Sequence, residues 1–432
     1  MPDASKERVV AVVATMDTKG AEAAFVAEVL RERGVAPLLV DVGFTKPAGA
    51  GDVTNEEVAR SAGMEVADLR ALPSRDQMVA AMGRGAAAIL AQRLQAGALH
   101  GVLALGGNQG ASIAALALRD LPFGLPKAIV TTMASGNVRP YVGCKDILTL
   151  FSVADLAGGP NRVTAPVLRN AALAVAGMAL GARAVNSSAA VSGRRSAVGG
   201  QRSAVGITAL GNTHPAVTRA MERLAAAGYE PIAFHASGAC GSAMEELAEA
   251  GALAAVLDLT PHELSEEIIG DGTYTPVHPG RMTAAGRRGI PQVVSTGGME
   301  YLCFGPPETV PAKYRGRPCA MHNPMNPNIR LNAEELARVG RAMADRLNAA
   351  RGPAAVFVPL RGWSVYGGPG GPLRDPEADA ALVRALAERL DARVPLHRLD
   401  LHINDPAFAD TCVDTLLAML AARTEVKGLR TE

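Results

Sequence analysis

Apolar and polar residues alternate along this chain with two different periods. Short runs rich in β-branched residues predict buried strands. These runs lie at residues 9–14, 37–40, 102–105, 127–131, 204–208, 231–234, 254–257, 291–294, 355–358 and 394–399. Between them, apolar residues recur with the period of a helix at residues 21–33, 76–96, 112–119, 216–227, 243–250, 333–349, 377–390 and 406–422. Apolar strands that alternate with helices are typical of parallel sheets covered by helices on both faces.

One stretch without apolar periodicity divides the chain. Residues 187–203 are rich in Ser, Gly and Arg, which is typical of a linker. The segments on either side, residues 1–186 and 204–432, both begin with a strand, a polar turn containing Gly and Thr, a helix and a second strand. We therefore predict two Rossmann-like α/β lobes, with parallel sheets flanked by helices, that face each other across a cleft.

Composition and charge narrow the class of protein. The 432 residues carry 43 basic and 42 acidic side chains, and the resulting formal charge of +1 argues against a nucleic-acid or membrane surface. Aromatic residues make up only 3% of the chain, which argues against a base-stacking platform. The five cysteines include no CxxC pair, and the N-terminus has no signal-peptide layout. We expect a cytoplasmic protein without a disulfide framework or a cysteine zinc site.

Three strand-to-helix turns of the first lobe carry candidate phosphate-binding residues. TMDTKG, LGGNQGAS and TTMASGN each follow a predicted strand. Such turns leave backbone N–H groups free for anions, and the alternative for each is a helix cap, a tight turn or an ordinary loop. Parallel strands end at one edge of a sheet, so the three turns can share one ligand. The residues assigned to nucleotide binding are Thr15, Asp17, Thr18, Lys19, Gly106, Gly107, Asn108, Gln109, Gly110, Thr132, Ser135 and Gly136.

The turn FHASGACGSAME in the second lobe has the same strand–glycine–helix layout, which predicts a second anion-binding turn. Arginines elsewhere in this lobe could clamp a carboxylate. The residues assigned to substrate binding are His235, Ser237, Gly238, Gly241, Arg281 and Arg330. Cys240 lies beside a predicted helix N-terminus, which favours a thiolate, but we interpret it as a small buried cysteine.

Histidines and carboxylates in the strand-end loops of the second lobe are candidate acid–base groups. The residues assigned to catalysis are His262, Glu263, His322, His402 and Asp405, with Asp258 beside them. His262 is the first candidate base, and Glu263 or Asp405 is expected to orient a histidine. Asp405 before a proline is equally a helix N-cap. No HExxH or similar ligand spacing is present, so no metal ligand is assigned, and we expect at least three of these side chains to meet at one point.

The order of these motifs resembles that of the Tm-one-like ATP-binding family over nearly the whole chain. The matching segments include ATMDTKGAE, LALGGNQGAS, TTMASGNV, LGNTHP, FHASGACGSAMEEL, LDLTPHEL, HNP and HINDPAFA. The resemblance implies two α/β lobes, a homodimer and ATP held by the first lobe. The chain departs from the family pattern at Cys240, Glu300, Cys303 and Pro327, where relatives tend to have Gly, Asp, Asn and Thr. All four departures fall in the second lobe.

Together these observations predict an ATP-binding protein that uses Mg²⁺. We expect an enzyme that acts on a small carboxylated or phosphorylated metabolite between its two lobes. Two alternatives remain open: a nucleotide-responsive binding protein without turnover, and a histidine- or metal-dependent hydrolase that does not use ATP.

Overall fold

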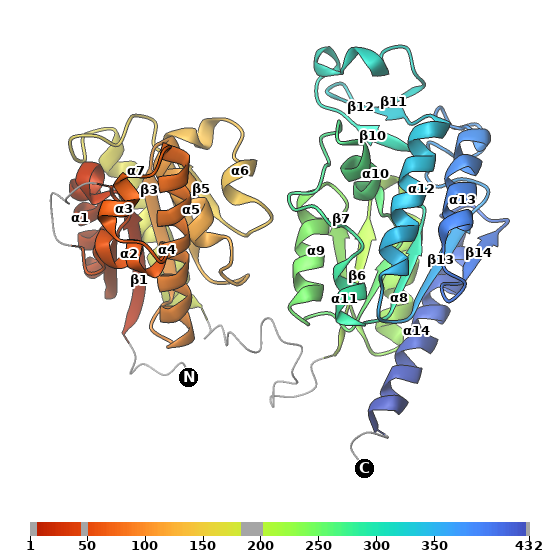
Figure 1. Ribbon diagram of the computed structural model, residues 1–432, viewed down its shortest axis with the longest axis horizontal. Helices are drawn as coiled ribbons and strands as arrows, with labels where there is room; N and C mark the ends of the chain where they lie inside the picture. Colours follow the sequence, from red (N-terminus) through yellow and green to blue (C-terminus); the bar gives the residue numbers. More distant parts are fainter. Residues whose placement is uncertain (1–6, 45–50, 183–201, 429–432) are drawn as a thin grey trace. The chain divides into compact units, whose positions relative to one another are not determined.

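The computed structural model describes residues 7–44, 51–182 and 202–428 (Figure 1). The chain divides into two compact units, Met1–Ala190 and Val191–Glu432. Most of the predicted linker, residues 187–201, lies outside the described residues. Each unit has its own sheet and its own cores, and each is described by itself.

The first unit alternates strands and helices from its first strand onward. Its elements are β1 (Arg8–Ala14), α1 (Met16–Glu32), β2 (Val35–Asp41), α2 (Asn55–Ser61), α3 (Val66–Arg70), α4 (Arg75–Gln95), β3 (Gly101–Gly106), α5 (Asn108–Leu118), β4 (Lys127–Thr131), the 3-10 helix η1 (Thr132–Ser135), α6 (Arg139–Val142), β5 (Leu148–Phe151) and α7 (Thr164–Gly181).

The sheet of the first unit is parallel throughout, in the order β2-β1-β3-β4-β5. The chain moves from β1 outward to β2 and then returns to β3 on the other side of β1. The direction of the crossovers therefore reverses between β1 and β3. Helices α1 and α7 pack on one face of the sheet, and α2, α4 and α5 pack on the other. The turn after β1 therefore leads to α1 on one face of the sheet, and the turn after β3 leads to α5 on the opposite face.

The second unit repeats this alternation with longer insertions. Its elements are β6 (Ala204–Ala209), η2 (Gly211–Thr213), α8 (His214–Ala226), β7 (Glu230–His235), α9 (Ala239–Glu249), β8 (Ala255–Asp258), α10 (His262–Ile269), α11 (Ala284–Arg288), β9 (Gln292–Ser295), β10 (Tyr301–Cys303), η3 (Pro307–Thr309), η4 (Ala312–Tyr314), β11 (Cys319–Asn323), β12 (Asn326–Arg330), α12 (Ala333–Asn348), β13 (Ala354–Pro359), α13 (Pro376–Arg389), β14 (Leu396–Leu399) and α14 (Pro406–Gly428).

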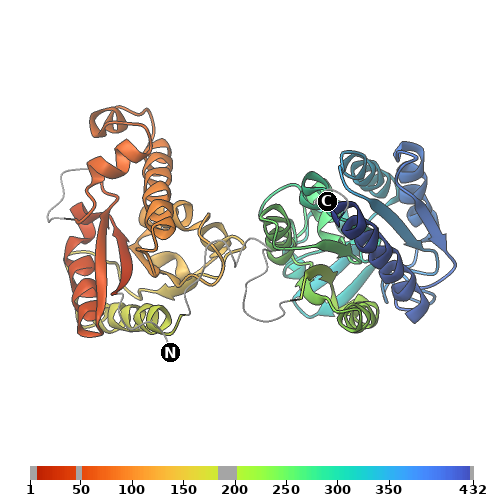
Figure 2. The same ribbon diagram turned by 90° about the horizontal axis from the view of Figure 1, so that it is seen from below.

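Its main sheet is also parallel, in the order β14-β13-β9-β8-β6-β7, and its crossovers reverse between β6 and β8. Helices α8 and α14 pack together on one face, where Figure 2 shows α14 as the dark blue helix. Helices α9 to α13 cover the other face. Both units therefore share one strand order around the reversal, which is where ligands bind in sheets of this class.

A small antiparallel sheet is inserted between β9 and α12 of the second unit. Its strand order is β10-β12-β11, and Figure 1 shows it above α10. The sequence analysis did not predict this sheet, nor did it predict β5 or α7. The predicted class, two α/β lobes with parallel sheets flanked by helices, is confirmed. Among the described residues, no helix combines the length and the apolar character needed to cross a bilayer.

Candidate functional site

The turn after β1 is the first turn of α1 and is closed by its own polar groups. The hydroxyl oxygens of Thr15 and Thr18 lie 2.9 Å apart, and the Lys19 N–H donates to the Thr15 carbonyl at 2.8 Å. No side chain caps the helix N-terminus. Lys19 is partly exposed and makes no ion pair within the described part of the chain. Its ammonium group is therefore available to a ligand at this strand end.

The turn after β3 brings two glycines into close contact. A Cβ atom on Gly106 would lie 2.6 Å from the Cα of Gly110, so the backbone could not close in this way with a larger residue. A Cβ atom on Gly107 would instead meet only Thr132 Oγ1, at 3.7 Å. Gly107 is the N-cap residue of α5 and provides no side-chain cap. The first N–H groups of α5 therefore have no capping side chain, and the space beside Gly107 is open among the described residues.

The other predicted nucleotide-binding residues lie in the first turn of α5, in η1 or directly after η1. They are Asn108, Gln109, Thr132, Ser135 and Gly136. Asn108 Oδ1 accepts a hydrogen bond of 2.8 Å from the Tyr141 hydroxyl, which fixes this side chain. All three turns follow strands of one parallel sheet, at the edge where the crossovers reverse.

Two carboxylates meet at the same edge. A Cβ atom on Gly43 would lie 3.0 Å from Oδ1 of both Asp17 and Asp41. Asp41 Oδ1 accepts N–H bonds from Met16 and Gly43, whereas its Oδ2 is buried and has no partner among the described residues. Burial raises the pKa of Asp41, and the negative charge of Asp17 adds to this effect. The sequence analysis missed Asp41, although it directly follows the predicted strand 37–40.

In the second unit, the predicted anion-binding turn is filled by a carboxylate of the chain itself. Glu263 Oε1 accepts hydrogen bonds from the N–H groups of Gly238 and Gly241. A Cβ atom on Gly241 would overlap the Glu263 carboxylate. Among the described residues, the Ser237 side chain bonds only the carbonyl of His235, two residues earlier. In this arrangement Glu263 takes the place that we had expected an anionic substrate to occupy.

Arg281 completes this internal ion network. It is fully buried, and its guanidinium bonds Glu263 at 2.7 Å, Asp258 at 3.0 Å and Glu245. Burial raises the pKa of Glu263, while the charge of Arg281 opposes this shift. The structure thus places Glu263 and Arg281 in the support of the α9 turn. Both side chains are fully buried, so in this arrangement neither is exposed for its predicted role, catalysis for Glu263 and substrate binding for Arg281.

Arg330 lies apart from this network, and so do His402 and Asp405, the two predicted catalytic residues near the C-terminus. Arg330 bonds Asp379 at 2.5 Å and the carbonyl of Glu300 at 3.3 Å, and it is almost fully buried. His402 Nε2 lies 3.0 Å from the carbonyl oxygen of Ser364. Asp405 accepts the backbone N–H of His402 at 2.7 Å. These groups hold loops together and do not line the pocket described next.

One pocket of the second unit lies at the reversal of its strand order. It has a volume of about 50 Å³, enough for a few water molecules. It is lined by the turn after β6, the last residue of β7, the small antiparallel sheet and two tyrosines from other loops. Its polar lining is formed by Asn212, His235, Tyr274, Tyr301, His322, Asn326, Asn328 and Tyr366. Two of the predicted residues, His235 and His322, therefore face one cavity.

The electrostatics of this pocket favour neutral groups. Burial lowers the pKa of His235, and the nearby His262 and His322 lower it further. Burial raises the pKa of Tyr301 well above its usual value. The Tyr301 hydroxyl accepts a hydrogen bond of 2.6 Å from Asn212, and His322 Nδ1 lies 3.4 Å from the Tyr366 hydroxyl. The pocket thus offers neutral imidazole, phenol and amide groups to a small polar ligand.

His262 lies behind this pocket in a buried cluster. Its Nε2 lies 3.2 Å from Glu266 Oε1 and 3.5 Å from Cys303 Sγ, while its Nδ1 lies 2.6 Å from the Gly298 carbonyl. Burial alone would lower the pKa of His262, but Cys303 and Glu266 raise it well above its usual value. Burial raises the pKa of the Cys303 thiol, and His262 opposes that shift. Cys303 also lines the pocket, and it therefore connects the cluster to the cavity.

The sequence analysis missed the two partners of His262. Glu266 follows His262 by four residues, a spacing that places both side chains on one face of a helix, but no helix was predicted at residues 262–269. No sequence spacing points to Cys303, because it comes from strand β10, whereas His262 and Glu266 lie on helix α10.

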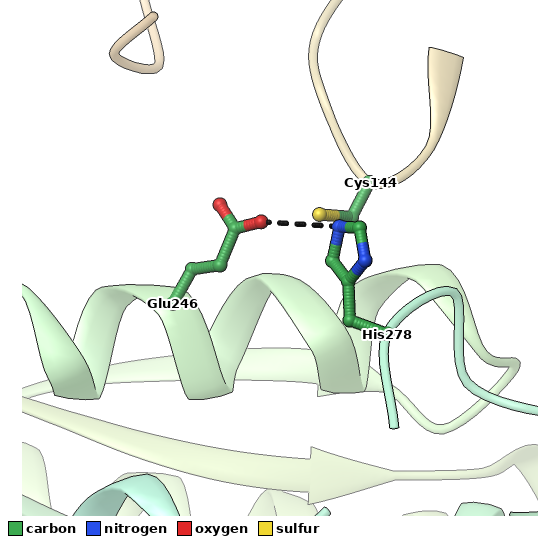
Figure 3. A group of neighbouring side chains, drawn as sticks. All are labelled: Cys144, Glu246 and His278. Carbon is green, nitrogen blue, oxygen red and sulfur yellow. Dashed lines mark ion pairs between the residues drawn. The ribbon is translucent and has the colours of Figure 1, made fainter. Parts of the chain in front are cut away.

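Two further groups lie outside the pocket, on and beside α9. Cys240, in the first turn of α9, is exposed, so our interpretation of it as a buried cysteine is wrong. Figure 3 shows Glu246 of α9 beside His278, whose Nε2 lies 3.5 Å from Glu246 Oε1. Cys144, drawn in the same figure, belongs to the first unit.

Comparison with known proteins places both units in one family. The models for the N-terminal and C-terminal domains of the uncharacterised protein family UPF0261 match residues 8–184 and 202–420. The UPF0261 protein of Rhizobium meliloti is 39% identical over 405 residues, which are 93% of this chain and 96% of that protein. A UPF0261 protein of Clostridium tetani is 35% identical over 95% of this chain and 98% of its own.

A plant protein is also similar. The ToMV resistance protein Tm-1(GCR237) of Solanum lycopersicum is 35% identical over 321 residues, which are 74% of this chain and 41% of the tomato protein. The predicted resemblance to the Tm-one-like family is confirmed by this match. On the evidence of its two matching domains and its bacterial relatives, the chain belongs to the UPF0261 family.

Proposed function

We propose that the first unit binds ATP, as its Mg²⁺ complex, at the carboxyl ends of β1, β3 and β4. One observation carries this proposal: the uncapped N-termini of α1 and α5 lie on either side of the point where the strand order reverses. Ligands bind at this point in parallel sheets, and helix N-termini favour phosphate through their N–H groups and dipole. The open space over Gly107 leaves room for the phosphates.

Charged side chains at this edge suit a nucleotide–metal complex. Lys19 supplies a positive charge without a protein partner among the described residues. Mg²⁺ in nucleotide sites is held by one or two carboxylates together with phosphate oxygens. Asp17 and Asp41 offer such carboxylates, and the buried Oδ2 of Asp41 is an acceptor that a cation would satisfy.

The test is calorimetric titration with ATP and Mg²⁺, together with thermal unfolding. A ligand at 100 times its dissociation constant should raise the free energy of unfolding by about 2.7 kcal/mol. Gly107→Val should abolish binding, because its side chain would enter the open space over the turn, where a Cβ atom makes only an ordinary contact of 3.7 Å with Thr132 Oγ1. Pyrophosphate and ADP, titrated in parallel, would separate nucleotide recognition from simple phosphate binding.

Gly177→Val is the matched control. Gly177 lies on the exposed side of α7, and a Cβ atom there meets nothing within 4 Å. This variant should bind ATP as the parent does. If millimolar ATP gives the parent neither heat nor a higher unfolding temperature, or if Gly107→Val binds as tightly as the parent, the first unit is not an ATP site.

We propose further that the chain is an enzyme for a small carboxylated or phosphorylated metabolite, with the pocket of the second unit as its reaction site. The imidazole of His235, whose lowered pKa favours its neutral form, supports this proposal together with the imidazole of His322 and the phenol of Tyr301, because all three groups can donate hydrogen bonds to such a ligand. A nucleotide-responsive binding protein without turnover is the second candidate, since the tomato relative is named for virus resistance and not for a reaction. Conversion of any compound in a panel of such metabolites, with ATP present, would favour the enzyme.

We also propose that the chain forms a homodimer. The edge strand β5 of the first unit pairs with β4 and leaves its other edge unpaired within the described sheet. Leu148 and Phe151 on this strand are 41% and 39% exposed. An apolar edge strand is prone to pair with another chain, and a second copy would cover it.

A further inference from the structure

The buried cluster behind the second-unit pocket has the donor set of a transition-metal site. An imidazole, a carboxylate and a thiol, from His262, Glu266 and Cys303, bring one ligand atom each within 4.8 Å of one another. All three residues are buried. Nitrogen, oxygen and sulfur ligands in one site are typical of zinc, whereas magnesium and calcium prefer oxygen alone.

The hydrogen bond of His262 Nδ1 fixes which ring nitrogen is available. A carbonyl oxygen can only accept, so the 2.6 Å contact with Gly298 places a proton on Nδ1. In the neutral ring Nε2 then carries the lone pair and faces Glu266 and Cys303. Metal-bound histidines usually donate their second N–H to a carbonyl or a carboxylate in this way.

The short distance between Glu266 and His262 indicates that a proton or a cation lies between the carboxylate and the imidazole. Glu266 Oε1 and His262 Nε2 are both acceptors when the ring is neutral, yet they lie 3.2 Å apart. Glu266 Oε1 also accepts the Cys303 N–H at 2.7 Å, while its Oε2 is buried and has no partner among the described residues. A proton or a metal ion between the donors would remove this conflict.

The spacing of the donor atoms suits a tetrahedral ion. With zinc–ligand bonds of about 2.0–2.3 Å, neighbouring ligand atoms of a tetrahedron lie roughly 3.3–3.6 Å apart. His262 Nε2 lies 3.5 Å from Cys303 Sγ and 3.2 Å from Glu266 Oε1. No large movement of these side chains is therefore required to bind the ion.

We propose that His262, Glu266 and Cys303 bind one zinc-type divalent ion whose fourth position opens into the pocket. Three protein ligands and one open position are the arrangement of catalytic zinc sites, in which water or a substrate oxygen completes the coordination. Cys303 lines the pocket, and His235 and Asn328 lie around the same cavity. A small ligand with a carboxylate or hydroxyl oxygen can thus reach the ion and these donors together.

The experiment measures metal content on the full-length chain. Protein purified under reducing conditions is stripped with a chelator, reconstituted with Zn²⁺, desalted and analysed by mass spectrometry of the metal. We expect about one zinc ion per chain. Reconstitution with Co²⁺ should give a thiolate-to-cobalt charge-transfer band and the visible absorption typical of a tetrahedral site, and these report directly on the sulfur ligand.

Three single variants test the ligands. Cys303→Ser should remove the charge-transfer band, and His262→Gln and Glu266→Gln should weaken zinc binding by more than the ~10–100-fold that loss of an outer-shell partner costs. Because His262→Gln and Glu266→Gln keep the size of the side chain or nearly so, circular dichroism should show folded protein for at least one of them. Cys319→Ser and His278→Gln are the matched controls, since both residues are at least partly exposed and lie outside the cluster, and they should retain zinc.

Two results would overturn the proposal. The first is a parent protein that retains no zinc after reconstitution, which would leave a proton-filled hydrogen-bonded cluster as the interpretation. The second is zinc retained equally by the parent, Cys303→Ser and His262→Gln but lost in His278→Gln, which would assign the ion to the surface pair that includes Glu246.

Discussion

The Glu300 side chain lies in a buried position that disfavours its ionised form. It is fully buried before β10. One of its oxygens accepts a hydrogen bond from the Ser364 hydroxyl, and the other has no partner among the described residues. Burial raises the pKa of Glu300 to about 7, and the negative charge of Asp379 adds to the shift. In the folded chain this group therefore remains protonated at pH values where it is ionised in the unfolded chain.

This difference makes stability depend on pH. Between pH 4.5 and about 7 the folded state holds a proton that the unfolded state has lost, so the free energy of unfolding should fall as the pH rises through this window. The total loss amounts to about 3 kcal/mol. Glu300→Gln should remove this slope, because the amide is neutral at every pH. Urea denaturation at pH 5 and pH 8 measures the effect.

Glu388→Gln provides the comparison, since Glu388 lies exposed on α13. It should leave the difference between pH 5 and pH 8 as it is in the parent. An equally large difference in Glu300→Gln and in the parent would show that Glu300 does not carry the shift.

At the same scale, the candidate site shows which residue roles a sequence can predict. His235 and His322 were assigned from their strand-end loops, and they line one pocket. Glu263 was expected to orient a histidine, but it binds the α9 turn and Arg281. A glycine-rich turn indicates that some anion is needed. It does not indicate whether a ligand or a side chain more than twenty residues away supplies it.

The start of α12 is specified by its local sequence. Asn332 and Glu335 form a reciprocal capping box at α12, with both side chain–backbone hydrogen bonds at 2.9 Å. Asn332→Ala should lower the free energy of unfolding by about 1 kcal/mol, because it leaves a helix N–H without a partner. Chemical denaturation measures the loss.

Asn332→Ser keeps a capping oxygen and should retain most of the stability. If Asn332→Ala and Asn332→Ser unfold at the same denaturant concentration as the parent, the cap contributes nothing to this helix. Glu335 also forms an ion pair of 2.7 Å with Arg317. Both residues are present in both variants, so a difference in stability between the variants reports on the cap.

Helix α7 and strands β10 to β12, which were not predicted, have weak periodicity. Helix α7 reads TAPVLRNAALAVAGMALG, in which alanine and other apolar residues fall on every face, so no single face stands out. Strands β10 to β12 have three to five residues and pair antiparallel through contacts distant in sequence. Central strands of the two parallel sheets, such as β3 and β13, were predicted because they are buried along their whole length and almost entirely apolar, as burial on both faces requires.

For the whole molecule, the proposed homodimer is the prediction to test. Light scattering should give twice the chain mass of 44.5 kDa at micromolar concentration. Leu148→Glu should shift the mass toward the monomer, because a charge on the β5 edge opposes pairing with a second chain. Leu360→Glu, at a similarly exposed apolar position of the second unit, should remain dimeric. A parent protein of monomer mass at every concentration would exclude the dimer.

The carboxylate of Glu263 in the α9 turn acts as a tethered ligand. A tethered group has an effective concentration set by the fold, in the millimolar range or above, and dilution of the protein does not change it. A free anion in the cell would have to displace this group, so the α9 turn should not respond to metabolite levels. The Gly106–Gly110 turn of the first unit has no such occupant among the described residues. Of the two glycine-rich turns, only the turn of the first unit is thus expected to respond to an external anion.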